Sequence, residues 1–377
     1  MKILFVTLGD YLSPKTGGAR YTSEVLEILR QNDLEVLSLY DFIFVRSKYV
    51  RLVAALLISL LRKMPLPVLY FYSSSFERKV LSRISELEKD GKFCLILDHL
   101  ELCYLLRKLN SDGNYSVVHL SHNQEQKIFL DKSGGGRFYR YSEYMFPYSA
   151  FEGRVFNSVD AVVSISETDS EYFSTLNPSV SLLTLLPTFS YTPKTKTELR
   201  RANALPKKLV YLANLAWMPN MEGLKWLISE LAPVLPREFE IHVYGGGLDD
   251  NKAATLNPPS NVFLNGYVDD INEVFDNAFF SLSPMQYGAG INIKVTESLH
   301  NQVPVIVSSI SYEGIPLKYT NGLIKLDLNA GLWVDELRRY LASSSEYETL
   351  RGCIQYPAPS EMAVKLNEFL EDELRKK

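Results

Sequence analysis

Residues that could bind a ligand or take part in a reaction lie close together in the stretch SPMQYGAGINIKVTESLHNQVPVIVSS, residues 283–309. Gly288 and Gly290 stand just before a helix-like run. Glycines let a backbone approach a ligand closely, and N–H groups at the start of a helix attract anions. The stretch therefore has the makings of a phosphate cradle.

Two charged residues follow on the expected helix. Glu297 lies about one turn in, where a carboxylate cannot bind phosphate but can accept hydrogen bonds from sugar hydroxyls. Lys294, three residues earlier, shares its helix face and could neutralise a phosphate. The spacing equally supports a plain turn in which Glu297 compensates the helix dipole, so both interpretations stay open.

The elements that must position these residues follow a βαβ pattern. Short β-branched apolar runs alternate with longer amphipathic segments, as in parallel sheets covered by helices on both faces. We expect strands at KILFVTL, LEVLSLY, FCLILDHL, YSVVHLSH, DAVVSIS and SVSLLTLLP, and then at KLVYLANL, FEIHVYGGG, NVFLNGYV, FFSLSPM and VPVIVSS. The fold class is therefore predicted as α/β.

The composition changes between the two halves. Residues 188–208 are polar, basic and punctuated by proline, which is typical of a linker. We predict an N-terminal domain at 1–190, a linker at 191–207, a second domain at 208–355 and a C-terminal helix at 356–377. Open α/β sheets bind ligands beyond the carboxyl ends of their strands, and two such units facing each other form a cleft.

Bulk properties narrow the class of protein. The chain has 377 residues, of which 46% are hydrophobic, and this is enough for about two domains. Its net charge of -4 does not suggest a nucleic-acid partner. Three scattered cysteines without a CxxC pair favour a reduced, cytoplasmic setting, and the five histidines show no zinc-ligand spacing.

The longest apolar run, LVAALLISLL at residues 52–61, raises the question of a membrane. It is too short to span a bilayer as a helix, which takes about 20 residues. Basic residues flank it, namely Arg46, Lys48, Arg51, Arg62 and Lys63. Either this is a core-facing helix, or it is a basic, apolar surface that lies on the inner face of an anionic membrane.

Several motifs, taken in order, resemble one family. GAGINIKVTESLHNQVPVIVSSISYEGI resembles the nucleotide-binding segment of GT-B glycosyltransferases, specifically retaining glycosyltransferase family 4 in its Gly-Ala-Gly-Ile branch. Further matches are SPKTGGARYTSEVLEIL, VVHLSHNQEQ, AFEGRVFNSVDAVVSISETD, YLANLAWMPNMEGLKWL, IHVYGGG and NGYVDDINEVFDNAFFSLSPM. Singly these are weak, but their order along most of the chain makes the resemblance strong.

The resemblance implies two Rossmann-like parallel-sheet domains facing across a cleft, with the final helix packing back on the first. It also implies transfer of a sugar from a nucleotide-sugar to an acceptor, with retention of anomeric configuration and without a cofactor or metal. The donor would bind mainly to the C-terminal domain and the acceptor to the N-terminal one. We expect a lipid-linked or cell-surface glycan as acceptor, as in polysaccharide biosynthesis.

Site roles carry over from the family by matched position. Glu297 matches the glutamate that binds the donor ribose, and backbone N–H groups of Gly290, Ile291 and Asn292 would bind the diphosphate. Tyr267 and Val268 stand where the backbone meets the nucleobase. Gly17 and Gly18 match the loop that approaches the diphosphate and acceptor, and His122 matches the active-site histidine. For Asn220, the sequence itself predicts a helix N-cap first and a phosphate contact second.

Two departures from the family pattern concern charge. Ala289 stands where many members carry a first glutamate, although the Gly-Ala-Gly branch commonly lacks it. The loop ANLAWMPNMEG holds neither the Arg nor the Lys that often neutralises phosphate, so Lys294 is the substitute candidate. We expect front-side attack, in which Lys294 and the N–H groups stabilise the leaving diphosphate.

Alternatives remain beside this interpretation. The departures motivate a non-catalytic GT-B subunit that assists a partner transferase, and a nucleotide-sugar epimerase shares the fold. A dehydrogenase is disfavoured because no GxGxxG opens either half. His122 could be a core histidine, His99 faces the cleft or the core with equal weight, and Glu125 and Glu152 are expected to position helices.

Overall fold

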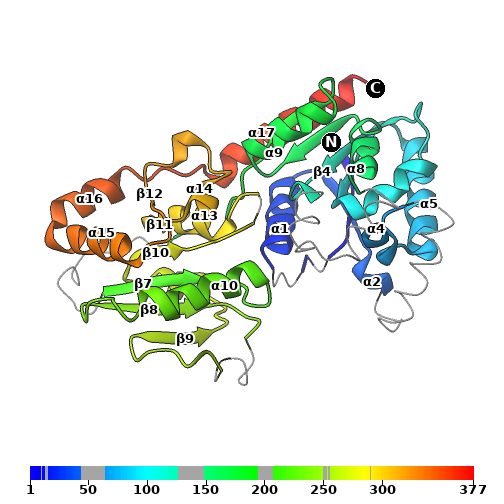
Figure 1. Cartoon of the computed structure of the whole chain (residues 1–377). Helices are drawn as coiled ribbons and strands as arrows, with labels where there is room; N and C mark the ends of the chain where they lie inside the picture. The colour runs from blue at the N-terminus through cyan, green and yellow to red at the C-terminus, as the bar shows by residue number, and fades with distance from the viewer. Residues whose placement is uncertain are drawn as a thin grey trace. The chain divides into compact units, whose positions relative to one another are not determined.

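The computed structural model describes residues 1–9, 11–12, 16–43, 64–125, 148–193, 207–248, 253, 255–288 and 290–377. The chain divides into two compact units (Figure 1). The first unit comprises Met1–Pro14, Gly18–Leu186 and Pro359–Lys377, and the second comprises Lys15–Gly17 and Pro187–Ala358.

The first unit contains a six-stranded parallel sheet in the order β2-β1-β3-β4-β5-β6. Its strands are β1 (Lys2–Thr7), β2 (Asp33–Ser38), β3 (Phe93–Asp98), β4 (Tyr115–Leu120), β5 (Ala161–Ser164) and β6 (Ser181–Thr184). Every residue of β3 and β4 is buried, as the continuous apolar runs predicted. The strand order reverses between β1 and β3, and ligands of open α/β sheets bind at such a switch point.

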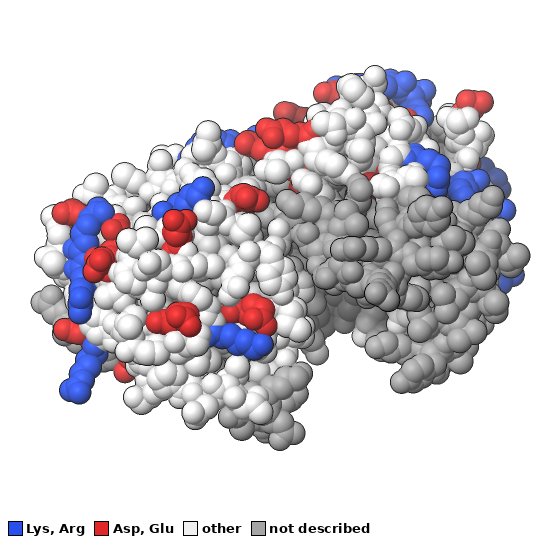
Figure 2. Space-filling view, viewed as in Figure 1, with Lys and Arg blue, Asp and Glu red and all other residues white. Residues whose placement is uncertain are grey.

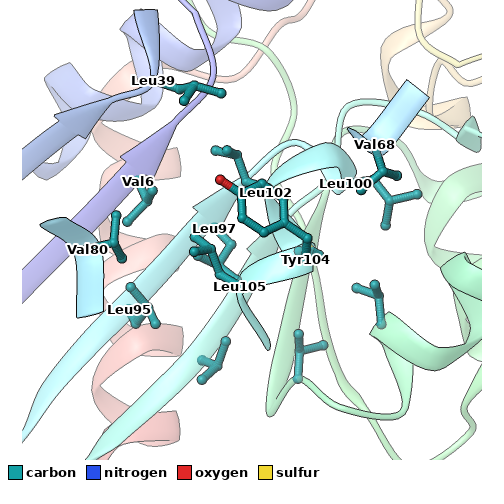
Figure 3. Close-up of a cluster of buried hydrophobic side chains, with 14 of the residues drawn as sticks. Val6, Leu39, Val68, Val80, Leu95, Leu97, Leu100, Leu102, Tyr104 and Leu105 are labelled. Carbon is teal, nitrogen blue, oxygen red and sulfur yellow. The ribbon is translucent and has the colours of Figure 1, made fainter. Parts of the chain in front are cut away.

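Helices enclose this sheet and its core. They are α1 (Gly17–Leu29), α2 (Tyr40–Ile43), α4 (Leu66–Tyr70), α5 (Ser74–Asp90), the 3-10 helix η1 (Leu100–Lys108), α8 (Tyr148–Phe156) and α9 (Glu167–Leu176). Figure 3 shows side chains of β1 and β3, such as Val6 and Leu97, packing with Val80 of α5 and Tyr104 of η1. This core fixes the carboxyl ends of β1 and β3.

The last helix, α17 (Pro359–Arg375), belongs to the first unit. Its buried residues Met362, Leu366 and Leu370 recur every fourth position, which places them on one helix face. The Ser116 hydroxyl of β4 donates to the Glu373 carbonyl at 2.8 Å. The chain thus returns to the first sheet after completing the second unit.

The second unit contains another six-stranded parallel sheet, in the order β12-β11-β10-β7-β8-β9. Its strands are β7 (Lys207–Leu212), β8 (Phe239–Tyr244), β9 (Val262–Gly266), β10 (Ala278–Ser283), β11 (Val305–Val307) and β12 (Leu323–Lys325). The helices are α10 (Met218–Trp226) with a π turn at Leu227–Leu231, α12 (Ile271–Phe275), α13 (Ile293–His300), α14 (Ser309–Tyr312), the 3-10 helix η3 (Leu317–Tyr319), α15 (Ala330–Ala342) and α16 (Ser344–Gly352). Its switch point lies between β7 and β10.

The α/β prediction and its expected strands are confirmed, with β12 as an additional strand. The expected N-cap at Asn220 is wrong, because α10 already begins at Met218, with Trp217 before it and proline at its second position. Most of the expected linker, residues 194–206, lies outside the described residues.

The charges on the surface and the hydropathy of the helices bear on whether nucleic acid or a membrane could be a partner. On the face shown in Figure 2, acidic and basic side chains are interspersed over the second unit and form no basic stripe. Among the described helices, none has the length and hydropathy needed to cross a bilayer. The basic, apolar segment at residues 46–63 lies outside the described residues.

Candidate functional site

The predicted site residues fall into two groups, one in each unit. In the second unit, loops at the carboxyl ends of β7 and β8 lie against each other. A Cβ at Gly245 would lie 1.9 Å from the Ala213 carbonyl oxygen, and one at Gly247 would lie 2.3 Å from the Ala216 nitrogen. The glycines of the IHVYGGG motif therefore allow two backbones to meet where ligands bind in this fold.

The Gly-Ala-Gly segment follows β10 and packs on another glycine. Gly290 and Gly314 have φ of 74° and 81°, in the left-handed region that favours glycine. A Cβ at Gly314 would lie 3.2 Å from the nitrogen of Ile291 and 3.3 Å from the Gly290 carbonyl oxygen. The later Glu-Gly of the motif thus has a packing role, whereas Ala289 lies outside the described residues.

Three consecutive backbone N–H groups lie just before α13. Within the described part of the chain, the N–H groups of Gly290, Ile291 and Asn292 donate no hydrogen bond. Asn292 precedes α13 without capping it through its side chain. The helix dipole adds a partial positive charge at this end, so the segment suits an anion.

Lys294 reaches back from α13 to α10 and β7. Its Nζ lies 2.5 Å from Asn220 Oδ1, 3.4 Å from the Met285 sulfur and 5.0 Å from the centre of the Tyr211 ring. Burial lowers the pKa of Lys294 to about 7.

The other predicted donor residues lie on α13 or directly after β9, beyond the carboxyl ends of the strands of the second sheet. Glu297, only 1% exposed, lies on α13 one turn after Lys294. Tyr267, 62% exposed, and the half-buried Val268 directly follow β9. The structure therefore brings Lys294 and Asn220 into contact and places Tyr267 two strands away from β7.

In the first unit, His122 follows β4 and meets Asp98 at the end of β3. His122 Nε2 lies 2.5 Å from Asp98 Oδ1. Asp98 Oδ2 accepts from Thr7 at 2.6 Å and from Thr22 at 3.0 Å. His122 is thus a buried, hydrogen-bonded residue in a polar cluster at the carboxyl ends of β1, β3 and β4.

His99 is the third member of this cluster. Its ring stacks on that of His122 with centroids 3.9 Å apart, and its Nδ1 lies 3.1 Å from Asp98 Oδ1. Burial opposes charge on all three residues, yet the two imidazoles hold the pKa of Asp98 below its ordinary value. Asp98 in turn raises the pKa of His99 to about 9, against the effect of burial.

The core histidine of this region is His119. Its Nδ1 lies 3.1 Å from the Leu97 carbonyl oxygen, and burial lowers its pKa to about 4. Glu152 accepts from the Glu125 N–H at 3.1 Å and from the Tyr172 hydroxyl at 2.8 Å, so its carboxylate joins α8 to α9 and to the residues after β4.

The glycines expected on the acceptor side open α1. Gly17 is the first residue of α1 and Gly18 the second. A Cβ at Gly18 would lie 3.5 Å from His122 Nδ1. The sequence interpretation missed Asp98, Thr7 and Thr22, although the polar residues that end two adjacent buried strands were a usable signal.

Asp98, His99 and His122 each offer a ligand atom, all within 4.8 Å of one another, as a metal site requires. The two rings, however, are stacked with an interplanar angle of 27°. Stacked rings direct their lone pairs along roughly parallel planes, whereas the ligands of one metal ion converge on it. The geometry therefore favours a hydrogen-bonded cluster.

A family model described as "Glycosyl transferases group 1" matches residues 206–343, which is most of the second unit. A curated relative, "Uncharacterized 44.6 kDa protein in cps region" from Klebsiella pneumoniae, is 22% identical over 263 residues. The match covers 65% of this chain and 65% of the relative, slightly less than two thirds of its length.

Solved structures share the fold over nearly the whole chain. Sucrose-phosphate synthase from Thermosynechococcus elongatus gives a TM-score of 0.68 at 13% identity, with 100% of each chain covered. HepE from Anabaena, in complex with UDP, gives 0.63 at 10% identity, covering 99% of this chain and 100% of its own. WaaG, a glycosyltransferase involved in lipopolysaccharide biosynthesis, gives 0.60 at 14% identity, covering 96% and 98%. The chain therefore has the GT-B fold of glycosyltransferases, and its residues 206–343 match the group 1 glycosyl transferases.

Proposed function

We propose that this protein is a glycosyltransferase that moves a sugar from a nucleotide-sugar to a glycan acceptor, with retention of anomeric configuration. The observation that carries the proposal is the start of α13, where the backbone N–H groups of residues 290–292 donate no hydrogen bond to a described residue and are followed in sequence by Lys294. Such an arrangement stabilises the negative charge that develops on a leaving diphosphate. The match to group 1 glycosyl transferases covers this segment.

The other donor contacts in this proposal are those that the family resemblance implies. Glu297 accepts hydrogen bonds from the donor ribose, and Tyr267 and Val268 contact the nucleobase through their backbone. His122 contacts the transferred sugar, and the leaving phosphate helps to deprotonate the acceptor. The reaction requires neither a cofactor nor a metal ion, so activity should persist in excess EDTA.

Calorimetric titration with a panel of nucleotide-sugars tests the donor site. UDP-sugars are the first choice, because the similar structure of HepE was solved with UDP. The Glu297→Gln variant should weaken donor binding by about 10- to 100-fold, the equivalent of one lost buried hydrogen bond. Glu348→Gln, at an exposed position on α16, is the matched control and should bind like the parent.

Product analysis tests the reaction itself. NMR of the product should show the anomeric configuration of the donor, whereas an inverted product would contradict retention. Donor turnover without any acceptor would instead indicate an epimerase. Absence of binding to every nucleotide-sugar would favour a non-catalytic subunit.

We propose a lipid-linked or cell-surface glycan as acceptor. The proposal rests on the basic, apolar segment at residues 46–63 and on the fold shared with WaaG. Charge reversal at Arg62 and Lys63 should weaken flotation with anionic liposomes and leave donor affinity unchanged. Equal flotation of variant and parent would count against membrane contact.

A further inference from the structure

We propose that Asp98 is a positioning residue that fixes His122 as a neutral hydrogen-bond acceptor for a substrate hydroxyl, while His99 carries the positive charge of the cluster. The identification of that hydroxyl as one on the transferred sugar rests on the proposed function. The division of charge among the three residues rests on the geometry of the first unit alone.

The tautomer of His122 follows from the carboxylate beside it. Thr7 and Thr22 both donate to Asp98 Oδ2, so Oδ1 remains for the imidazoles. An ionised carboxylate only accepts hydrogen bonds, so His122 Nε2, 2.5 Å from Oδ1, must carry the proton. A neutral ring protonated at Nε2 has a bare lone pair on Nδ1.

His99 is the member of the histidine pair that carries the positive charge. Two imidazolium rings stacked 3.9 Å apart would repel each other, so one of the pair stays neutral. The side chain of His99 is 22% exposed and that of His122 only 5%, so His99 keeps more of its hydration. Glu101 and Glu125 add to the effect of Asp98 on His99, whereas burial and the charge of His99 lower the pKa of His122.

Of the two ring nitrogens of His122, Nε2 is held by Asp98, and Nδ1 is the one left for a ligand. It is buried without a hydrogen-bond partner among the described residues, which is costly unless a ligand satisfies it. It lies beside Gly18, where the absence of a side chain leaves space, while the Tyr21 ring packs edge-on against the imidazole. His99 adopts φ of 74°, an uncommon backbone conformation for a residue with a side chain and one that clusters at functional sites.

The experiment is nitrogen NMR on the full chain labelled with 15N-histidine, which contributes five imidazoles. His122→Gln and His99→Gln assign the two rings. In the parent at neutral pH, we expect the Nε2–H tautomer for His122 and a charged ring for His99. A charged or Nδ1–H His122, or a neutral His99, would overturn the proposal, as would a stoichiometric bound metal measured by mass spectrometry.

Two variants distinguish a role of Asp98 in positioning His122 from a purely structural role. Asp98→Asn should give mixed tautomers at His122 and lower kcat by about 10- to 100-fold. Its affinity for UDP, which lacks the sugar, should stay within about twofold of the parent's, because Lys294 and α13 belong to the second unit. Thr22→Ser keeps the donor hydroxyl and should keep the parent tautomer.

His99→Gln supplies a second test that does not require the buried carboxylate to change. Removing the adjacent positive charge should raise the pKa of His122 and move the acid limb of the kcat/KM profile to higher pH. Unchanged pKa values in this variant would contradict the division of charge. If the tautomers are as expected but no nucleotide-sugar is turned over, the proposed function fails while the positioning role of Asp98 stands.

Discussion

The ammonium of Lys294 lies 2.5 Å from the side-chain oxygen of Asn220, and no carboxylate of the described residues lies within ion-pair distance of it. An amide oxygen orients an ammonium group without neutralising it. Asn220 is in turn fixed at both ends, because its Nδ2 donates to the Asn214 carbonyl and its own carbonyl accepts from the Tyr211 hydroxyl. The positive charge of Lys294 is thereby positioned and left available to an anionic ligand.

This arrangement predicts a pH dependence for donor binding. Burial lowers the pKa of Lys294 to about 7, so the free protein loses this charge as the pH rises through about 7. A nucleotide-sugar diphosphate binds the protonated form better, so affinity should be highest below pH 7 and fall above it, by at most about tenfold per unit. Calorimetry between pH 6 and 8.5 measures this.

Two variants at this pair provide the controls. Asn220→Asp keeps the shape but adds a carboxylate, which should hold Lys294 charged, weaken donor binding at pH 6 and flatten the pH dependence. Lys294→Met should also bind weakly at every pH. If the donor affinity of the parent protein were constant from pH 6 to 8.5, the charge of Lys294 would not contribute to binding the diphosphate.

Gly314→Ala should disturb the backbone of Gly290 and Ile291, on which Gly314 packs although it lies more than 20 residues later in the sequence. The residue has φ of 81°, and its added methyl would lie 3.2 Å from the nitrogen of Ile291. We expect a loss of about 1–3 kcal/mol in stability and a raised donor KM.

Gly352→Ala is the control for Gly314→Ala. Gly352 ends α16, its φ is outside the left-handed region, and nothing lies within 4 Å of its added Cβ. Thermal unfolding and donor titration compare the two variants. Equal behaviour of both would mean that the contact between Gly314 and the Gly290–Ile291 backbone is unimportant.

The fold was predictable because buried parallel strands leave a strong pattern. All six residues of β3 and of β10 are buried, and their apolar runs could be recognised without any contact information. The three-residue β12 carries too short a pattern and was missed. Helix starts were less certain, as Asn220 shows, because a proline at the second helical position moved the start of α10 ahead of the expected cap.

The candidate site was predictable only where a motif spans consecutive residues. Glu297 and Lys294 share one helix, so their spacing was informative. Asp98 and His122 come from different strands, and only the pairing of β3 with β4 brings them together. Their contact depends on sheet order, which local periodicity does not encode, and the stacking of His99 on His122 likewise required coordinates.

Gly18→Ala separates stability from activity in the first unit. The residue lies in α1, where alanine favours helix over glycine by about 0.5–1 kcal/mol, and its Cβ would meet His122 Nδ1 at an ordinary 3.5 Å. The variant should therefore be as stable as the parent or more so, while the methyl group occupies the place of a substrate hydroxyl and lowers kcat/KM. Unimpaired activity would contradict the role of Nδ1 as a ligand acceptor.

The C-terminal helix α17 offers a test of how the first unit is completed. Leu370 is fully buried in it, and the carbonyl of this residue accepts from the Cys94 thiol of β3 at 3.5 Å. Leu370→Ala should lower stability by about 2–5 kcal/mol, since it leaves a cavity beside the sheet. Val364 lies on the same helix but is 55% exposed, so Val364→Ala should change stability by less than about 0.5 kcal/mol. Chemical unfolding followed by fluorescence and circular dichroism compares the pair, and equal losses in both variants would mean that α17 does not pack on the sheet through its Leu370 face.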